Sequence, residues 1–107
     1  MHTLERRPLG LSGIEVSRLA LGAMTFGTRM PPISTVDRAA AETMLERAVE
    51  AGVNFVDTAD AYSGGESEEI LAPFLSRHRE HLVVATKLGW TGDQVRPLSR
   101  ENVFGSV

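Results

Sequence analysis

Three short apolar runs recur along the chain, and stretches with the periodicity of helices separate them. The runs cover Leu19–Met24, Val53–Asp57 and Leu82–Thr86, and each is apolar on both alternating faces, as is typical of buried parallel strands. Their first residues lie 34 and 29 positions apart, so each gap has room for a crossover helix. This pattern predicts an α/β protein with a parallel sheet and leaves open whether the sheet is a barrel or doubly wound.

The first gap contains the clearest helix. Ser34 is predicted to cap it, with Asp37 as its capping-box partner, and Gly52 stands where a helix typically ends. A second, less regular helix is predicted around Ser67–Leu75, where Pro73 should kink it or mark its limit. The first helix has an apolar face formed by Ala41, Met44, Leu45, Ala48 and Val49.

Two further elements lie toward the ends of the chain. Thr3–Leu9 and Ile14–Ser17 flank the turn-forming sequence Gly10-Leu11-Ser12-Gly13, which predicts a β-hairpin over residues 3–17. Units of strand and helix follow from residue 19 onward, and a third helix begins after Ser99.

The composition excludes several classes of function. With 107 residues the chain can hold one domain at most, and without cysteine it has no thiolate metal site. A net charge of −3 gives no basic footprint for nucleic acid, and no apolar run is long enough for a membrane span or a secretion signal. We therefore expect a cytoplasmic protein that binds neither nucleic acid nor membrane. His78 and His81 form an H-x-x-H motif, which without further ligands indicates a solvated loop rather than a metal site.

The chemistry-bearing residues cluster at the predicted strand ends, where parallel α/β folds place their sites. Asp57 and Lys87 occupy matching positions on consecutive strands, so neighbouring strands would bring them about 5 Å apart, close enough for a buried ion pair. Tyr62 follows five residues after Asp57, and a fixed cation beside a tyrosine makes it a usable general acid. An ordinary ion pair beside a surface tyrosine explains the same pattern, and the residues alone leave both interpretations open.

Two neighbouring features are weaker signals. Trp90, close to Lys87, either lines a substrate pocket or shields the loop. The segment Gly22–Gly27 allows a ligand to approach the backbone closely, but it lacks the spacing of a dinucleotide-binding fingerprint. Lys87 is the only lysine of the chain, and Tyr62 is its only tyrosine.

Several segments, in order and at suitable spacing, resemble the aldo-keto reductases. The pattern R-x-L-G-x-S-G-x-x-V-S-x-L-x-L-G-x-M-T-F-G, from Arg7 to Gly27, is similar to the opening of that family. The segment Gly52–Tyr62 (GVNFVDTADAY) resembles its second strand and catalytic loop, and the likeness continues through Gly65–Glu68 and Val84–Lys87. It extends from about Thr3 to the last residue.

The resemblance implies the N-terminal part of a (β/α)8 TIM barrel, with the hairpin closing its bottom. It also implies reduction of aldehydes or ketones to alcohols with NADPH. Carried over by position, Tyr62 is the proton donor and Lys87 favours its ionised form. Asp57 holds Lys87 and faces the nicotinamide ribose.

By the same resemblance, Ala23 and Met24 lie beside the cofactor, and Phe26 and Trp90 help to line the pocket of a small carbonyl substrate. The family's fourth catalytic residue is a histidine at the end of its fourth strand, and this chain stops before that strand. We therefore expect residues 1–107 to form an incomplete barrel that is inactive alone. Two other possibilities stay open: a non-catalytic subunit of the same fold that senses nicotinamide cofactor, and a non-functional gene fragment.

Overall fold

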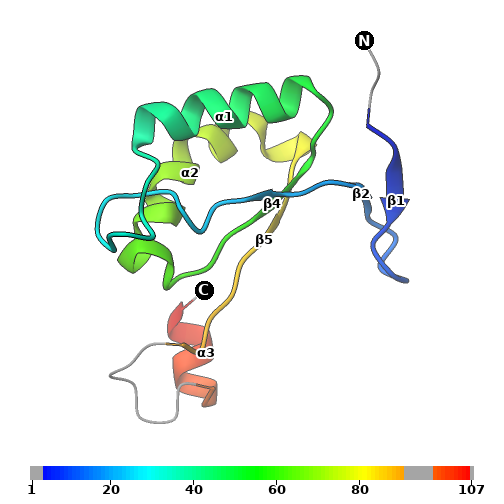
Figure 1. Ribbon diagram of the computed structural model, residues 1–107. Coiled ribbons are helices and arrows are strands. Elements are labelled where there is room, and N and C mark those ends of the chain that lie inside the picture. The colour runs from blue at the N-terminus through cyan, green and yellow to red at the C-terminus, as the bar shows by residue number, and fades with distance from the viewer. Residues whose placement is uncertain (1–3, 91–97, 107) are drawn as a thin grey trace.

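The computed structural model describes residues 4–90 and 98–106 (Figure 1). Thr3, predicted to open the hairpin, lies outside the described residues. Short 3₁₀ turns, Tyr62–Gly65 and Arg79–His81, flank the second long helix. The strands and α-helices alternate as predicted, in the order β1 (Arg6–Pro8), β2 (Glu15–Ser17), β3 (Leu21–Gly22), α1 (Arg38–Glu50), β4 (Phe55–Asp57), α2 (Glu66–His78), β5 (Val83–Ala85) and α3 (Arg100–Ser106).

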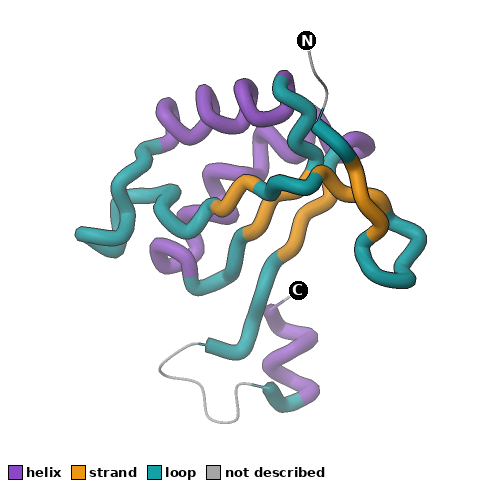
Figure 2. The backbone as a smooth tube through the Cα atoms, turned by 45° about the vertical axis from the view of Figure 1, so that its right-hand side comes forward, coloured by secondary structure: helices purple, strands orange, loops and turns teal. Residues whose placement is uncertain are grey.

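Strands β3, β4 and β5 form a parallel sheet in sequence order. Each strand is shorter than predicted, and Leu19 and Met24, expected inside the first one, lie outside β3 and are exposed. Figures 1 and 2 both show α1 and α2 on the same side of this sheet. The predicted α/β architecture is therefore confirmed, as an open sheet within the described part of the chain.

The hydrophobic core lies between the sheet and the two long helices. Of the apolar face predicted for α1, Ala41 and Leu45 are buried, whereas Met44 is exposed. The core is completed from α2, from the strands and from the segments beside them by Ala23, Phe26, Val56, Ile70, Leu71, Phe74 and Leu82. Burial of these side chains holds the helices on the sheet.

The start of α1 differs from the prediction. Its N-cap is Asp37, whose side chain accepts a hydrogen bond from the Ala40 N–H at 2.9 Å. Ser34 does not cap the helix, because its hydroxyl accepts from the Met30 N–H instead. At the other end, Gly52 follows the helix with φ = 101°, as predicted for a residue that ends a helix.

Pro73 does not mark the limit of α2, which continues to His78. A proline inside a helix removes the N–H that would bond to the carbonyl four residues earlier. Here that carbonyl belongs to Glu69, and both Glu69 and Pro73 are exposed. Water can therefore replace the missing donor.

The β1–β2 hairpin is held by Asn54, a buried residue immediately before β4. Asn54 Oδ1 accepts from the Ser17 N–H at 2.6 Å, and its Nδ2 donates to the Glu15 carbonyl at 3.0 Å. The Asn54 N–H donates in turn to Ser17 Oγ at 3.1 Å. These bonds fix the hairpin beside the start of β4 (Figure 1). Asp57 is the last residue of that strand.

Candidate active site at the carboxyl ends of the strands

Lys87 is the centre of a group of polar contacts just beyond β4 and β5. Its Nζ donates to the two carboxylate oxygens of Asp57 at 3.1 and 2.9 Å, and to the Thr58 carbonyl at 2.8 Å. The same atom lies 3.1 Å from the Tyr62 hydroxyl oxygen and 4.9 Å from the centroid of the Tyr62 ring. The structure therefore brings together Asp57, Tyr62 and Lys87, the three side chains predicted to be catalytic.

Backbone bonds keep these strand ends side by side beyond the last residues of the strands. The Thr58 N–H donates to the Ala85 carbonyl at 2.8 Å, and the Asp60 N–H donates to the Lys87 carbonyl at 3.1 Å. Tyr62 then opens the 3₁₀ turn over this edge. The continued pairing thus brings the segments that carry Lys87 and Tyr62 to one edge of the sheet.

The ion pair between Lys87 and Asp57 is not buried, contrary to the sequence prediction. The two side chains are 51% and 41% exposed, because the described strands form an open sheet whose edge is reached by water. The hydrogen bond to Asp57 raises the pKa of Lys87, and the bond to Tyr62 acts in the same direction against a smaller effect of desolvation. Lys87 therefore remains a cation at neutral pH.

An apolar pocket of about 190 Å³ lies beside Tyr62. Besides Tyr62, two further residues predicted at the site, Met24 and Trp90, line it. Both are exposed enough to meet a ligand. The full lining is Met24, Met30, Ile33, Ala61, Tyr62, Ser63 and Trp90.

Two other predicted site residues lie elsewhere. Ala23, expected beside the cofactor, and Phe26, expected in the substrate pocket, both have fully buried side chains and belong to the core. The reason is a local turn after β3, in which the Phe26 N–H donates to the Ala23 carbonyl at 3.1 Å. Neither side chain lines the pocket beside Tyr62.

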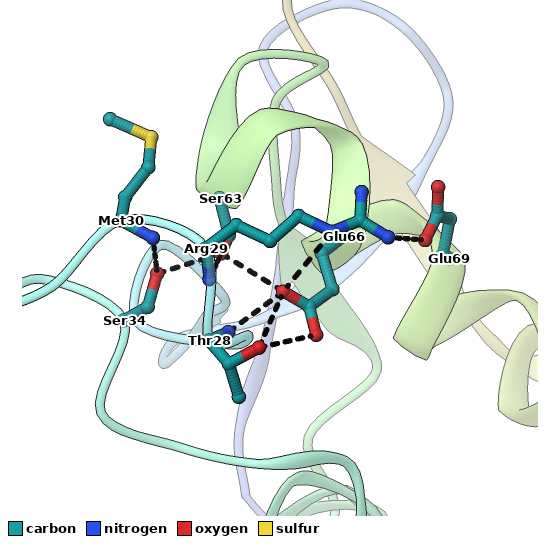
Figure 3. A network of polar contacts seen from close by, with 7 residues as sticks. All are labelled: Thr28, Arg29, Met30, Ser34, Ser63, Glu66 and Glu69. Carbon is teal, nitrogen blue, oxygen red and sulfur yellow. Dashed lines mark hydrogen bonds and ion pairs between the residues drawn. The ribbon is translucent and has the colours of Figure 1, made fainter.

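Sequence reasoning missed a polar network beside this pocket. Figure 3 shows side chains of Ser34, Ser63 and Glu66 bound to the segment that follows β3. The doublet Gly64-Gly65 signals a tight turn near Ser63. No spacing rule, however, pairs that turn with residues about thirty positions earlier.

Residues 4–90 and 98–106 contain neither a metal-binding cluster nor a membrane-spanning helix. No group of three or more histidine, cysteine, aspartate or glutamate side chains there is placed to hold a metal ion. In the same residues, no helix has the length and apolar character needed to cross a bilayer.

A sequence model of the aldo/keto reductase family matches residues 18–107. An uncharacterized oxidoreductase of Bacillus subtilis, YqkF, is 35% identical over 86 residues, which cover 80% of this chain and 26% of the relative. A probable voltage-gated potassium channel subunit beta of Oryza sativa subsp. japonica is 37% identical over 106 residues, which cover 94% of this chain and 30% of that protein.

Solved structures show the same likeness. A putative aldo-keto reductase from Pseudomonas aeruginosa aligns with a TM-score of 0.76 at 40% identity, covering 94% of this chain and 41% of that one. The aldo-keto reductase AKR11C1 from Bacillus halodurans, in its holo form, aligns with a TM-score of 0.70 at 31% identity, covering 85% and 28%. The chain thus spans well under half the length of these proteins. The predicted fold class, part of a TIM barrel, is confirmed.

Proposed function

Because this chain belongs to the aldo/keto reductase family, we propose that it is part of an oxidoreductase that reduces aldehydes or ketones to alcohols with NADPH. One observation carries the proposal: the Lys87 ammonium contacts both the Asp57 carboxylate and the Tyr62 hydroxyl at one edge of the sheet. We also propose that residues 1–107 belong to a single barrel domain, with the hairpin at the amino ends of its strands.

Tyr62 is the proton donor in the proposed reaction. Its hydroxyl proton goes to the carbonyl oxygen while the carbonyl carbon accepts a hydride, so the products are an alcohol and the oxidised cofactor. The Lys87 ammonium, 3.1 Å from the Tyr62 oxygen, stabilises the phenolate that remains. Asp57 holds that ammonium in place through both of its carboxylate oxygens.

The exposed groups at this edge fit a nicotinamide cofactor. Each Asp57 oxygen accepts one bond from Lys87 and keeps a further lone pair, so the exposed carboxylate can also accept from a ribose hydroxyl. Met24 offers an apolar surface at the edge of the pocket, where a nicotinamide ring can lie. NADPH would supply the hydride when bound, and Trp90, which lines the same pocket, would contact the organic group of the substrate.

The proposal is tested by following NADPH oxidation with a reactive aromatic aldehyde. The assay uses the 107-residue chain and, in parallel, the product of the complete reading frame that contains it. Tyr62→Phe should lower kcat by about 10²–10⁴-fold, the usual contribution of a positioned general acid, and Lys87→Met should also lower it. Arg38→Met, which removes an exposed cation at the start of α1, is the control and should leave kcat unchanged.

Two results would count against the reductase. If neither form of the protein oxidises NADPH with any aldehyde or ketone, the proposed activity is wrong. If turnover occurs and Tyr62→Phe retains it, another group donates the proton.

The rice relative favours a second candidate, because its name describes a probable channel subunit. On that alternative, the protein binds nicotinamide cofactor without turnover. Saturable cofactor binding with no oxidation would be its expected result. The contact between Lys87 and Tyr62 favours the reductase, since a site that only binds does not need a positioned proton donor.

A further inference from the structure

Three successive backbone N–H groups after β3 bind side-chain oxygens rather than other backbone groups. We call this arrangement the Glu66 clamp; it joins residues 28–30 to Ser34, Ser63 and Glu66 (Figure 3). Its backbone bonds are Thr28 N–H to Glu66 Oε2 (2.7 Å), Arg29 N–H to Ser63 Oγ (3.0 Å) and Met30 N–H to Ser34 Oγ (3.0 Å). Ser34 Oγ and Ser63 Oγ lie 2.7 Å apart and close the network.

Glu66 makes the largest number of these contacts. Its carboxylate also accepts from Thr28 Oγ1 at 3.2 and 3.3 Å and from Ser63 Oγ at 3.3 Å, and it lies 3.7 Å from Arg29 Nε. The side chain is only 17% exposed. Glu69 pairs with the same arginine at 2.9 Å, but it is 55% exposed. The bond from the Thr28 N–H is the main cause that lowers the pKa of Glu66, so the carboxylate is ionised at neutral pH.

The two segments of the clamp approach each other closely. Ser63 is almost fully buried and has φ = 52°, a conformation that residues other than glycine seldom adopt. Gly27 has φ = 129°, and a Cβ atom there would clash with Ser63 Oγ and lie 2.9 Å from Glu66 Oε2. Only a glycine permits this approach, which brings the clamp acceptors within reach of residues 28–30.

The clamp connects directly to the apolar pocket. Ser63 follows Tyr62 in the chain, and both residues line the pocket. The Met30 N–H donates to Ser34 Oγ in the clamp, and Met30 also lines the pocket. The Met30 carbonyl accepts a hydrogen bond from the Ile33 N–H at 2.9 Å. The positions of Met30 and Ile33 relative to Tyr62 therefore depend on the clamp.

We propose that Glu66 is a positioning residue, which holds residues 28–34 against the Tyr62 turn and so fixes Met30 and Ile33 as the apolar wall of the pocket. The assignment of this pocket to the substrate rests on the proposed function. The group that the wall accepts is uncharged and apolar, such as an aromatic ring attached to the carbonyl carbon. A charged group would lose hydration there without gaining a partner, so it binds more weakly.

Trp90 allows a binding test that requires no turnover. It is the only tryptophan of the chain and lines the pocket, so quenching of its fluorescence by 4-nitrobenzaldehyde measures occupancy. We expect saturable quenching of the wild-type chain, and weaker binding of 4-carboxybenzaldehyde. Glu66→Ala should weaken binding of the nitro compound about 5-fold or more, the equivalent of one net hydrogen bond, and reduce the preference for the uncharged probe.

Two further variants make the test specific. Glu66→Gln retains one acceptor oxygen. Its binding of 4-nitrobenzaldehyde should therefore be intermediate between that of the wild type and that of Glu66→Ala, about 2-fold weaker than in the wild type. Glu69→Ala is the matched control, because it removes a partner of Arg29 on the same helix but no backbone contact of the clamp. The dissociation constant of Glu69→Ala for 4-nitrobenzaldehyde should equal that of the wild type.

Amide hydrogen exchange distinguishes loosening of the clamp from general unfolding. In Glu66→Ala, exchange at residues 28–30 should become about tenfold faster or more, because locally opened amides exchange more readily. The amides of Ala41–Leu45 in α1 should keep their protection. If Glu66→Ala also loses the protection of these amides, Glu66→Gln is used in its place. Binding and amide exchange in Glu66→Gln equal to those of the wild type would then overturn the proposal.

The remaining outcomes of the binding and exchange measurements either support or overturn the positioning role of Glu66. Unchanged binding and exchange in Glu66→Ala would show that the carboxylate positions nothing, and a wild-type chain without saturable quenching would show that the pocket does not take this ligand. Either result overturns the inference. Binding that depends on Glu66 without any NADPH oxidation supports the positioning role and contradicts the proposed reductase alone. Where turnover occurs, Glu66→Ala should raise KM for benzaldehyde more than it lowers kcat.

Discussion

Replacing Asn54 with leucine should detach the hairpin from the sheet at a cost that follows from its contacts. Leucine has nearly the same size but neither accepts nor donates. The buried Ser17 N–H then loses its acceptor, and an unsatisfied buried group costs about 1–3 kcal/mol. The Glu15 carbonyl also loses a donor, but Glu15 is exposed and water can replace it. We expect a total loss of about 1–3 kcal/mol in the free energy of unfolding.

Thermal unfolding followed by circular dichroism measures this loss. For a domain of this size about 1 kcal/mol corresponds to a shift of roughly 4–8 °C, so Asn54→Leu should lower Tm by roughly 4–24 °C. The control is Thr43→Val, which removes an exposed hydroxyl bond to the Ala39 carbonyl within α1 and should cost at most about 0.5 kcal/mol. Equal Tm values for the two variants would contradict this prediction, since the Asn54 bonds would then contribute no more than a surface contact.

Three further substitutions test the turn at Gly27, the N-cap of α1 and the Glu66 clamp. Gly27→Ala should destabilise the fold by roughly 1–3 kcal/mol or more in urea denaturation, because its φ is strained for alanine and the new Cβ meets Ser63; an unchanged midpoint would contradict the close approach. Asp37→Ala should cost about 0.5–2 kcal/mol, measured in the same way, because α1 loses its N-cap. The Thr28 N–H lowers the folded-state pKa of Glu66 from 4.5, so the stability that Glu66 adds is present above that pH and is lost as the pH falls through the lowered value. The stability difference between the wild type and Glu66→Gln should therefore shrink toward acid pH, and a difference that grows would contradict the sign.

The sheet and the contact between Asp57, Tyr62 and Lys87 could be predicted because both depend on local patterns. Apolar runs report burial along the chain, and parallel strands place their carboxyl ends at one edge. Matching positions on neighbouring strands therefore become neighbours in space, as Asp57 and Lys87 do. The exposure of this pair could not be predicted from the sequence, because it depends on what covers the edge of the sheet.

Other parts of the site were beyond sequence reasoning for a different physical reason. Ala23 and Phe26 follow a strand in a turn that is closed by a backbone bond between them, and both side chains are buried in the core. The Glu66 clamp joins segments about 38 positions apart through side-chain oxygens, and neither periodicity nor turn chemistry encodes such pairing. Ser34 shows the consequence: it has the residue type of a helix cap, yet its hydroxyl serves the clamp.

The presence of one lysine in the chain makes covalent labelling a selective report on the site. Acylating reagents react with neutral amines, and Lys87 is half exposed but has a pKa raised chiefly by its bond to Asp57. The intact contacts should therefore slow its acylation relative to a free lysine side chain, and Asp57→Asn should accelerate it. Intact mass spectrometry would detect acylation of Lys87 as one added acyl group, besides any that is added at the chain's amino terminus. The rate of this addition therefore reports whether the contacts of Lys87 with Asp57 and Tyr62 have formed.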